Sequence, residues 1–182
     1  MGFDHFSAIA PIYARVTYSK KEMMREVASL PVQGRLLDVG GGTGRVSSAI
    51  REYVDEVIIA DVSFGMLARA PRPSLQPVCG ASETLPFADN FFERVIMVDA
   101  LHHVANHAHT AHEMFRVLKP GGVLVIEEPD IRTFGVKLIA LAEKLLLMRS
   151  HFLAPDGIMK LFDIGEKETK SVNGTAWVII KK

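Results

Sequence analysis

The feature that most constrains this chain is a turn made almost entirely of glycine, which follows a short apolar strand and precedes a helix. It lies in Arg35–Ser47, RLLDVGGGTGRVS. Glycine has no Cβ, so the backbone of such a turn can approach a bound ligand closely. Asp38 places a carboxylate near the carboxyl end of the strand, which is where ligands bind in open α/β sheets. The stretch therefore predicts an α/β fold with a ligand site at this turn.

Apolar runs that alternate with helical patterns continue along the chain and predict a mostly parallel sheet covered on both faces. The expected strands are about 35–39, 56–61, 76–80, 94–98 and 123–128. Pro120 and the paired glycines of LKPGG predict the end of a helix over about 110–118. Asn173-Gly174, between two strand-like runs, is typical of a β-hairpin turn. We expect a doubly wound, mostly parallel seven-stranded sheet with an antiparallel C-terminal hairpin.

Length and composition indicate a single domain over residues 1–182 and exclude several other classes of protein. The formal net charge is +0, which gives no long-range attraction to nucleic acid. Cys79 is the single cysteine, so no internal disulfide forms and a reducing compartment is expected. The N-terminus lacks a signal-peptide pattern, and the most apolar run, Phe134–Met148, is too short and too charged to span a bilayer. We therefore expect a cytoplasmic protein.

The spacing of the glycines separates this loop from two common nucleotide-binding motifs. A dinucleotide fingerprint needs a third glycine where Arg45 stands, and the next glycine is Gly44. A phosphate-binding P-loop, G-x-x-x-x-G-K-[ST], is absent as well, because Lys and Ser/Thr do not follow Gly44 in that order. Asp61 ends the second predicted strand, about twenty residues after the loop, where a carboxylate can accept both hydroxyls of a ribose. These features favour an adenosine compound that need not carry phosphates, such as S-adenosylmethionine, over glycines that only make a tight turn.

Five blocks of the sequence resemble the class I S-adenosylmethionine-dependent methyltransferases. Within that class the chain is most similar to the ubiquinone/menaquinone biosynthesis C-methyltransferase group. The blocks occur in family order between Phe6 and Asp130: FSAIAPIYA, LLDVGGGTG, VIIADVSFGML, ETLPFADNFFERVIMVDALHHV and FRVLKPGGVLVIEEPD. The resemblance implies a Rossmann-like methyltransferase fold, S-adenosylmethionine as cofactor and S-adenosylhomocysteine as product.

The resemblance also implies which residues bind the methionine part and the ribose of the cofactor. Asp38 and the backbone of Gly40, Gly41 and Gly42 would face the amino and carboxylate groups of the methionine part. Asp61 would hold the ribose hydroxyls.

The remaining implied contacts surround the adenine and the sulfonium. Val62 and Met66 would pack against the adenine ring. Tyr13 would lie on a lid over the methionine part, and Asp99, at the end of the fourth strand, would lie near the sulfonium.

Position 81 departs from the family pattern. Many members have an acidic residue here that accepts a hydrogen bond from the adenine amino group, whereas this chain has Ala81. The backbone of Ser82 remains available to the adenine ring. Loss of one hydrogen bond of roughly 0.5–1.5 kcal/mol lowers the expected affinity by about tenfold.

Histidines gather after the fourth strand, where His102 and His103 begin a run that includes His107, His109 and His112. No HExxH pattern or cysteine accompanies them, so no metal site is expected. A histidine beside the methyl acceptor can act as a general base. We regard His102 and His103 as candidates for that role, with a structural hydrogen-bonding role as the alternative.

Two segments outside the nucleotide motifs bear on the substrate. Residues 1–30 are expected to be helical, as a lid over the ligand or as a cover for one end of the sheet. Residues 131–162 form an expected helical insert on the substrate side, in which the apolar helix is either a pocket wall or a packing surface. If the helix is a pocket wall, the protein could contact a membrane surface peripherally. If it is a packing surface, it could form the contact of a homodimer.

The most favoured function is methyl transfer from S-adenosylmethionine to a small, apolar molecule by in-line displacement. The alternative is a regulatory or degenerate protein of the same fold that binds the cofactor without turnover, as Ala81 suggests. A nicotinamide-dependent oxidoreductase is disfavoured because the third glycine and a Tyr-x-x-x-Lys pair are absent.

Overall fold

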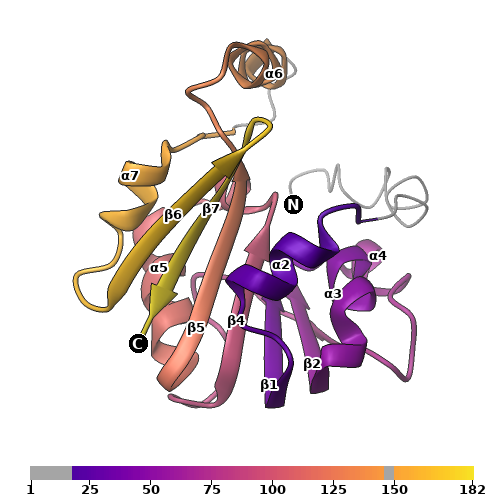
Figure 1. Ribbon diagram of the computed structural model, residues 1–182. Helices are drawn as coiled ribbons and strands as arrows, with labels where there is room; N and C mark the ends of the chain where they lie inside the picture. Colours follow the sequence, from indigo (N-terminus) through magenta and orange to yellow (C-terminus); the bar gives the residue numbers. More distant parts are fainter. Residues whose placement is uncertain (1–17, 146–149) are drawn as a thin grey trace.

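A seven-stranded sheet with helices on both faces forms the body of the protein (Figure 1). The computed structural model describes residues 18–145 and 150–182. The strands are β1 (Val32–Val39), β2 (Val54–Asp61), β3 (Gln76–Cys79), β4 (Phe92–Val98), β5 (Leu118–Pro129), β6 (Glu166–Val172) and β7 (Thr175–Lys181). Their order is β3-β2-β1-β4-β5-β7-β6, with β7 antiparallel to both of its neighbours and the other pairings parallel. The predicted fold class is confirmed.

The order of the strands reverses between β1 and β4 at the centre of the sheet. From β1 the chain proceeds outward to β2 and β3, and it then returns to place β4 on the other side of β1. In doubly wound sheets the connections diverge at such a point and leave a crevice at the carboxyl ends of the strands. The topology therefore places a ligand site beside the ends of β1 and β4.

Two hydrophobic clusters lie on opposite faces of the sheet. One face packs against α5 (His107–Val117) and α7 (Pro155–Met159), and the other against α2 (Lys21–Val27) and α3 (Arg45–Ile50). Leu36 and Leu37 belong to different clusters, and both are fully buried. Successive side chains of a strand point to opposite faces, so a continuous apolar run is what a strand covered on both faces requires.

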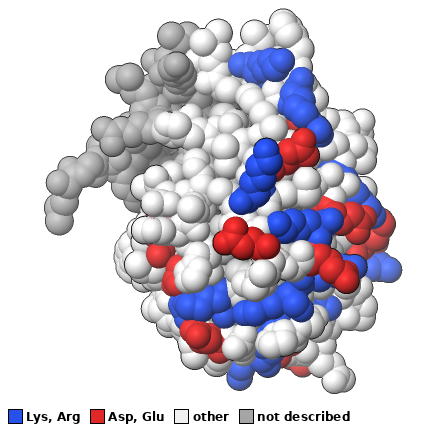
Figure 2. Space-filling view, turned by 90° about the vertical axis from the view of Figure 1, so that its left-hand side faces the viewer, with Lys and Arg blue, Asp and Glu red and all other residues white. Residues whose placement is uncertain are grey.

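The C-terminal hairpin completes the sheet as predicted. Asn173 and Gly174 both have positive φ, 50° and 78°, as a type I′ hairpin turn requires. Strand β7 is buried between β5 and β6, whereas β6 forms an edge of exposed, mixed charges. Figure 2 shows acidic and basic side chains intermixed rather than in a single patch. Charged side chains on an edge strand oppose further strand pairing.

The start of α5 and the start of β5 differ from the expected bounds for local reasons. Helix α5 begins at His107, before the expected 110, because Asn106 accepts a hydrogen bond from the His109 amide (3.0 Å) and caps the first turn. The helix ends at Val117, but the following LKPGG belongs to β5 instead of forming a separate turn. The register between β4 and β5 shifts there, so the strand accommodates Pro120 at an irregularity.

The two substrate-side segments are only partly described. Helix α2 packs on the sheet face through Met24 and Val27, which corresponds to the covering role. Of the lid expected over residues 1–30, residues 1–17 lie outside the described residues. Helix α6 (Phe134–Leu145) stands away from the sheet (Figure 1), and Phe134, Leu138 and Leu141 on it are 76%, 53% and 54% exposed. Within 18–145 and 150–182, no helix has the length and hydropathy needed to cross a membrane.

The Lys182 ammonium, directly after β7, anchors this end of the hairpin to the end of α5 and the start of β5. It donates hydrogen bonds to the carbonyls of Phe115 and Leu118, each at 2.7 Å. Lys182→Met retains the aliphatic stem and removes these donors, so we expect the free energy of unfolding to fall by about 1–3 kcal/mol. Denaturant unfolding measures the change. The exposed neighbour Lys181 provides the matched control, Lys181→Met, and equal losses in both variants would contradict the anchoring role.

Candidate functional site

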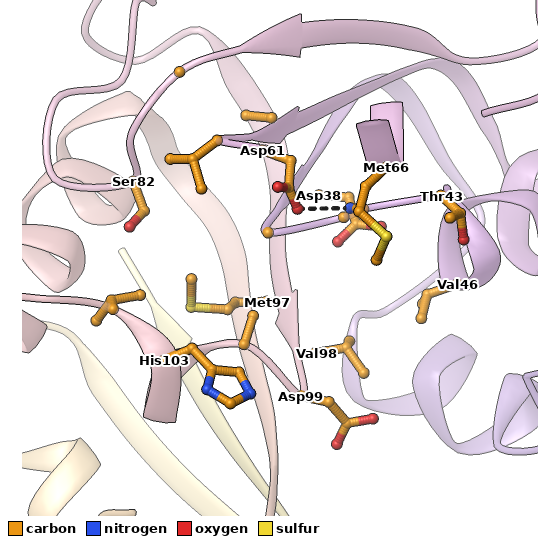
Figure 3. A pocket seen from close by; sticks show the side chains of 18 of the residues that line it. Asp38, Thr43, Val46, Asp61, Met66, Ser82, Met97, Val98, Asp99 and His103 are labelled. Atoms are coloured by element: carbon orange, nitrogen blue, oxygen red, sulfur yellow. Dashed lines mark hydrogen bonds between the residues drawn. The ribbon is translucent and has the colours of Figure 1, made fainter. Parts of the chain in front are cut away.

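A pocket of about 350 Å³ opens at the carboxyl ends of the parallel strands (Figure 3). This volume is within the range of roughly 300–1,000 Å³ that small-molecule sites occupy. The predicted residues that line it are Asp38, Gly40, Gly41, Gly42, Asp61, Val62, Met66, Ser82, Asp99 and His103. The pocket lies at the switch point that the strand order defines.

The glycine turn forms one wall of the pocket. Its backbone conformation and its close neighbours both disfavour residues with a side chain. Gly40 and Gly42 have φ of +71° and +55°, in the left-handed region that L-residues rarely adopt. A Cβ on Gly40 would come within 2.6 Å of the Ala100 Cβ, and one on Gly42 within 3.0 Å of the Met66 Cε. Substitution at either position would therefore fill space between the turn and the opposite wall.

Asp61 ends β2 and turns its carboxylate toward the glycine turn. One oxygen accepts a hydrogen bond from the Gly42 amide at 2.9 Å, and the other accepts one from the Ser63 amide at 2.8 Å. Two backbone donors hold the carboxylate at the pocket, as the dashed contact in Figure 3 shows for Gly42. Ser63 then caps helix α4 (Phe64–Leu67), because its side chain accepts a hydrogen bond from the Met66 amide. The end of β2 is thus rigid where a ribose would need a fixed acceptor.

Asp38 is a buried carboxyl whose charge is costly. Its side chain lies at 1% exposure and accepts a hydrogen bond from the Ser47 hydroxyl at 2.7 Å. Desolvation raises the pKa of Asp38 to about 7, and the nearby Asp61 adds to the rise, while the Ser47 hydrogen bond and Arg45 oppose it. Asp38 therefore changes protonation near neutral pH.

Asp99 ends β4 in a backbone conformation that is unusual for a residue with a side chain. Its φ is +52°, and such conformations cluster at functional sites. The Asp99 carboxylate pairs with the Arg45 guanidinium at 3.3 Å. Arg45 is the residue that excludes a dinucleotide fingerprint, and in the structure it links the glycine turn to the end of β4.

The segment after β3 supplies a hydroxyl and a carboxylate. The Ser82 hydroxyl lies 3.0 Å from the Thr110 hydroxyl and 3.2 Å from the Glu83 carboxylate. Glu83 also accepts hydrogen bonds from the amides of Ala105 and Asn106, at 3.0 and 3.2 Å. Ser82 and Glu83 line the pocket, whereas Ala81 is not among the lining residues.

The two candidate histidines have different environments. His103 lines the pocket, whereas His102 is 5% exposed and forms a hydrogen bond through Nδ1 to the Glu128 carboxylate at 2.5 Å. Both lie on the 3₁₀ turn η2 (Leu101–His103). No group of three or more potential metal ligands comes together within the described ranges 18–145 and 150–182.

Sequence reasoning missed part of the pocket, and one predicted residue falls outside the description. Tyr13 lies outside the described residues. The lining residues without an individual sequence signal are Thr43, Arg45, Val46, Ala60, Gly80, Glu83, Met97, Val98, Ala100, Val104 and Ala105. Most of them neighbour predicted residues at strand ends. A search for every residue within two positions of a predicted strand end would have found several of them.

Comparison with known families identifies the central part of this chain. Residues 37–126 match the family model described as a methyltransferase domain. This region begins in β1 and ends in β5, so it contains the glycine turn, Asp61, Asp99 and both candidate histidines, His102 and His103. The resemblance inferred from the sequence blocks is confirmed.

Two groups of relatives are similar to part of this chain. The demethylmenaquinone methyltransferase of Renibacterium salmoninarum is 40% identical over 111 residues, which are 60% of this chain and 46% of that protein. The ubiquinone/menaquinone biosynthesis C-methyltransferase UbiE of Coxiella burnetii is 37% identical over 105 residues, which are 52% of this chain and 42% of that protein. The chain thus spans about half the length of the relatives it matches.

Solved structures extend the similarity of fold to the whole chain. The structure of a SAM-dependent methyltransferase from Thermotoga maritima has a TM-score of 0.78 and covers 97% of this chain and 98% of its own. The sequence identity is 21%. This likeness confirms the Rossmann-like methyltransferase architecture, including the antiparallel C-terminal strands.

The burial of Asp38 predicts a pH-dependent stability. Its pKa is higher in the folded protein than in the unfolded chain, so the folded state binds more protons between about pH 4 and 7, and stability falls as the pH rises through that interval. Asp38→Asn removes this titration. The difference in free energy of unfolding, variant minus parent, should therefore increase by a few kcal/mol from pH 4 to pH 8, since each pKa unit corresponds to about 1.4 kcal/mol.

Thermal unfolding of both proteins from pH 4 to 8 measures this difference. The exposed Asp163 provides the control substitution, Asp163→Asn, which should leave the pH dependence unchanged. A difference between Asp38→Asn and the parent that stays constant with pH would show that Asp38 does not titrate in this interval.

Proposed function

We propose that this chain, which carries a methyltransferase domain over residues 37–126, binds S-adenosylmethionine in the pocket and transfers its methyl group to a small molecule. The observation that carries the proposal is the pairing of a glycine turn without room for a Cβ with a fixed carboxylate at the end of β2. S-adenosylmethionine, the cofactor expected from the sequence, is supported by the family match and by the SAM dependence named for the similar Thermotoga maritima protein.

The pocket residues fit the parts of this cofactor. In this proposal Asp61 accepts hydrogen bonds from the ribose hydroxyls, and Val62 and Met66, which also line the pocket, offer apolar surface to the adenine. Asp38 and the amides of the glycine turn lie where the methionine amino and carboxylate groups would be. Asp99 and its partner Arg45 lie at the end of β4, the side proposed for the reacting centre.

The chemistry needs alignment more than it needs an elaborate catalytic apparatus. A methyl group on a sulfonium already has a good leaving group, so the bound cofactor supplies the reactive carbon. The contribution of the chain is to hold donor and acceptor in line, and such positioning can lower a barrier by several kcal/mol. The in-line displacement expected from the sequence remains our proposal for the geometry of transfer.

The acceptor that we propose is a small quinone-type molecule in its reduced form. The names of both relatives refer to methylation of menaquinone or ubiquinone precursors. Met97, Ala100 and Val104 add apolar surface to the pocket lining, which suits an apolar ring. The alternative, a protein that binds the cofactor without turnover, predicts calorimetric binding with no methylated product.

Substitution of Asp61 tests the cofactor site. Asp61→Asn keeps one side-chain acceptor for the loop amides but removes the charge, so we expect S-adenosylhomocysteine to bind at least about tenfold more weakly. Isothermal titration calorimetry measures the affinity, and thermal unfolding verifies that the variant is folded. Asp163→Asn serves as the exposed control. An unchanged dissociation constant would remove Asp61 from the proposed site.

Position 81 offers a gain-of-affinity test of the adenine subsite. Ala81→Asp restores the acidic residue common in the family, and a new hydrogen bond to the adenine amino group should tighten cofactor binding by about tenfold. Calorimetry should show this gain for S-adenosylhomocysteine but not for an analogue with inosine in place of adenosine, which lacks the amino group. Equal gains for both ligands would indicate a general charge effect instead.

A further inference from the structure

His103 occupies the part of the pocket that the proposed cofactor contacts leave to the acceptor. Figure 3 shows Asp61 and Met66 on one side of the pocket, and His103 with Asp99 on the other. The neighbours of His103 in the lining are Ala100, Val104 and Ala105, none of which carries a titratable side chain. On this side, where we place the acceptor ring, the Asp99 carboxylate is paired with Arg45, which leaves His103 as the candidate base.

The backbone that carries His103 is clamped to β5 by one buried carboxylate. One oxygen of Glu128 accepts hydrogen bonds from the amides of Ala100 and Leu101, at 2.9 and 2.8 Å. The other oxygen meets Nδ1 of His102 at 2.5 Å. Because three consecutive residues are held by Glu128, the 3₁₀ turn is fixed up to the residue before His103.

The imidazole of His103 is fixed from two directions. Its ring centroid lies 4.0 Å from that of His102, which in turn stacks on Phe152 at 4.3 Å. Its Nδ1 lies 3.3 Å from the Ser150 hydroxyl. A proton on Nδ1 that is donated to Ser150 makes Nε2 the basic atom of the ring.

We propose that His103 is the general base for the methyl acceptor and that Glu128 and His102 are positioning residues for it. The inference rests on the proposed function and separates the two histidines that the sequence left equivalent. His103 reaches the pocket, whereas the buried His102 supports its ring from behind. An oriented imidazole next to a weakly acidic hydroxyl is the arrangement that general-base catalysis requires.

The proton and electrons balance as follows for a quinol acceptor. The acceptor O–H bond breaks and its proton moves to Nε2 of His103. The electron pair released into the ring forms a bond to the methyl carbon, the bond between that carbon and the sulfonium sulfur breaks, and its electron pair stays on sulfur. For attack through a ring carbon, that carbon gives its proton to solvent as the ring regains aromaticity.

The test compares His103→Gln with the parent protein, using 1,4-naphthoquinol kept reduced under nitrogen as the acceptor. At pH 7 the variant should transfer methyl at least about 100-fold more slowly, while calorimetry shows unchanged affinity for S-adenosylhomocysteine. Its rate should recover as the pH approaches the pKa of a phenolic hydroxyl, about 10, because the acceptor then ionises without a base. His112→Gln, an exposed histidine on α5, is the matched control and should behave as the parent.

A second readout does not depend on turnover. With S-adenosylhomocysteine bound, addition of 1-naphthol should shift the imidazole NMR resonances of His103 and leave those of His112 in place. An equal rate and pH profile in His103→Gln, a loss of S-adenosylhomocysteine binding in that variant, or no naphthol-induced shift would each overturn the role of His103. Failure of the parent protein to bind either S-adenosylmethionine or its product would instead overturn the proposed function.

Discussion

Two consecutive buried glutamates near the end of β5, Glu127 and Glu128, each fix the elements that pack on one face of the sheet. Successive side chains of a strand point in opposite directions, so one carboxylate serves each face. Glu127, fully buried, accepts hydrogen bonds from the Tyr18 hydroxyl, the Lys20 ammonium at 2.6 Å and the Trp177 indole at 3.0 Å. Burial, with the adjacent Glu127 charge, raises the pKa of Tyr18, which keeps its hydroxyl protonated as a donor. Buried carboxylates are tolerated only with such partners.

The sequence predicted the elements of the site better than the contacts that fix them. The glycine turn, Asp38 and Asp61 carry local signals, because turn geometry and strand ends depend on a few neighbouring residues. Glu127 and Glu128 have no such signal: in sequence they are the polar end of an apolar strand. Two of the partners of Glu127, Tyr18 and Trp177, are 109 and 50 residues away in the sequence. Only the folded chain brings these residues together, so periodicity cannot reveal them.

The described pocket is acidic although the chain has no net charge. Its lining contains Asp38, Asp61, Glu83 and Asp99, with Arg45 as the basic residue. Low-dielectric walls around charges of one sign concentrate their field, so the pocket favours a cation over a dinucleotide, whose phosphates are anionic. The tight glycine spacing and the acidic lining therefore each argue against a dinucleotide, for independent reasons. The glycine spacing and the acidic residues can both be read from the sequence, but only the fold shows that they line the same pocket.

The position of Trp177 gives the protein an internal reporter of its own assembly. It is the single tryptophan of the chain, and it lies on β7, buried between β5 and β6 with its indole bound to Glu127. Its fluorescence therefore depends on insertion of the C-terminal hairpin into the sheet, a pairing between segments some fifty residues apart that local structure cannot form alone. A kinetic phase seen by tryptophan emission will record closure of the sheet, whereas backbone circular dichroism will record the formation of helices and strands wherever they occur.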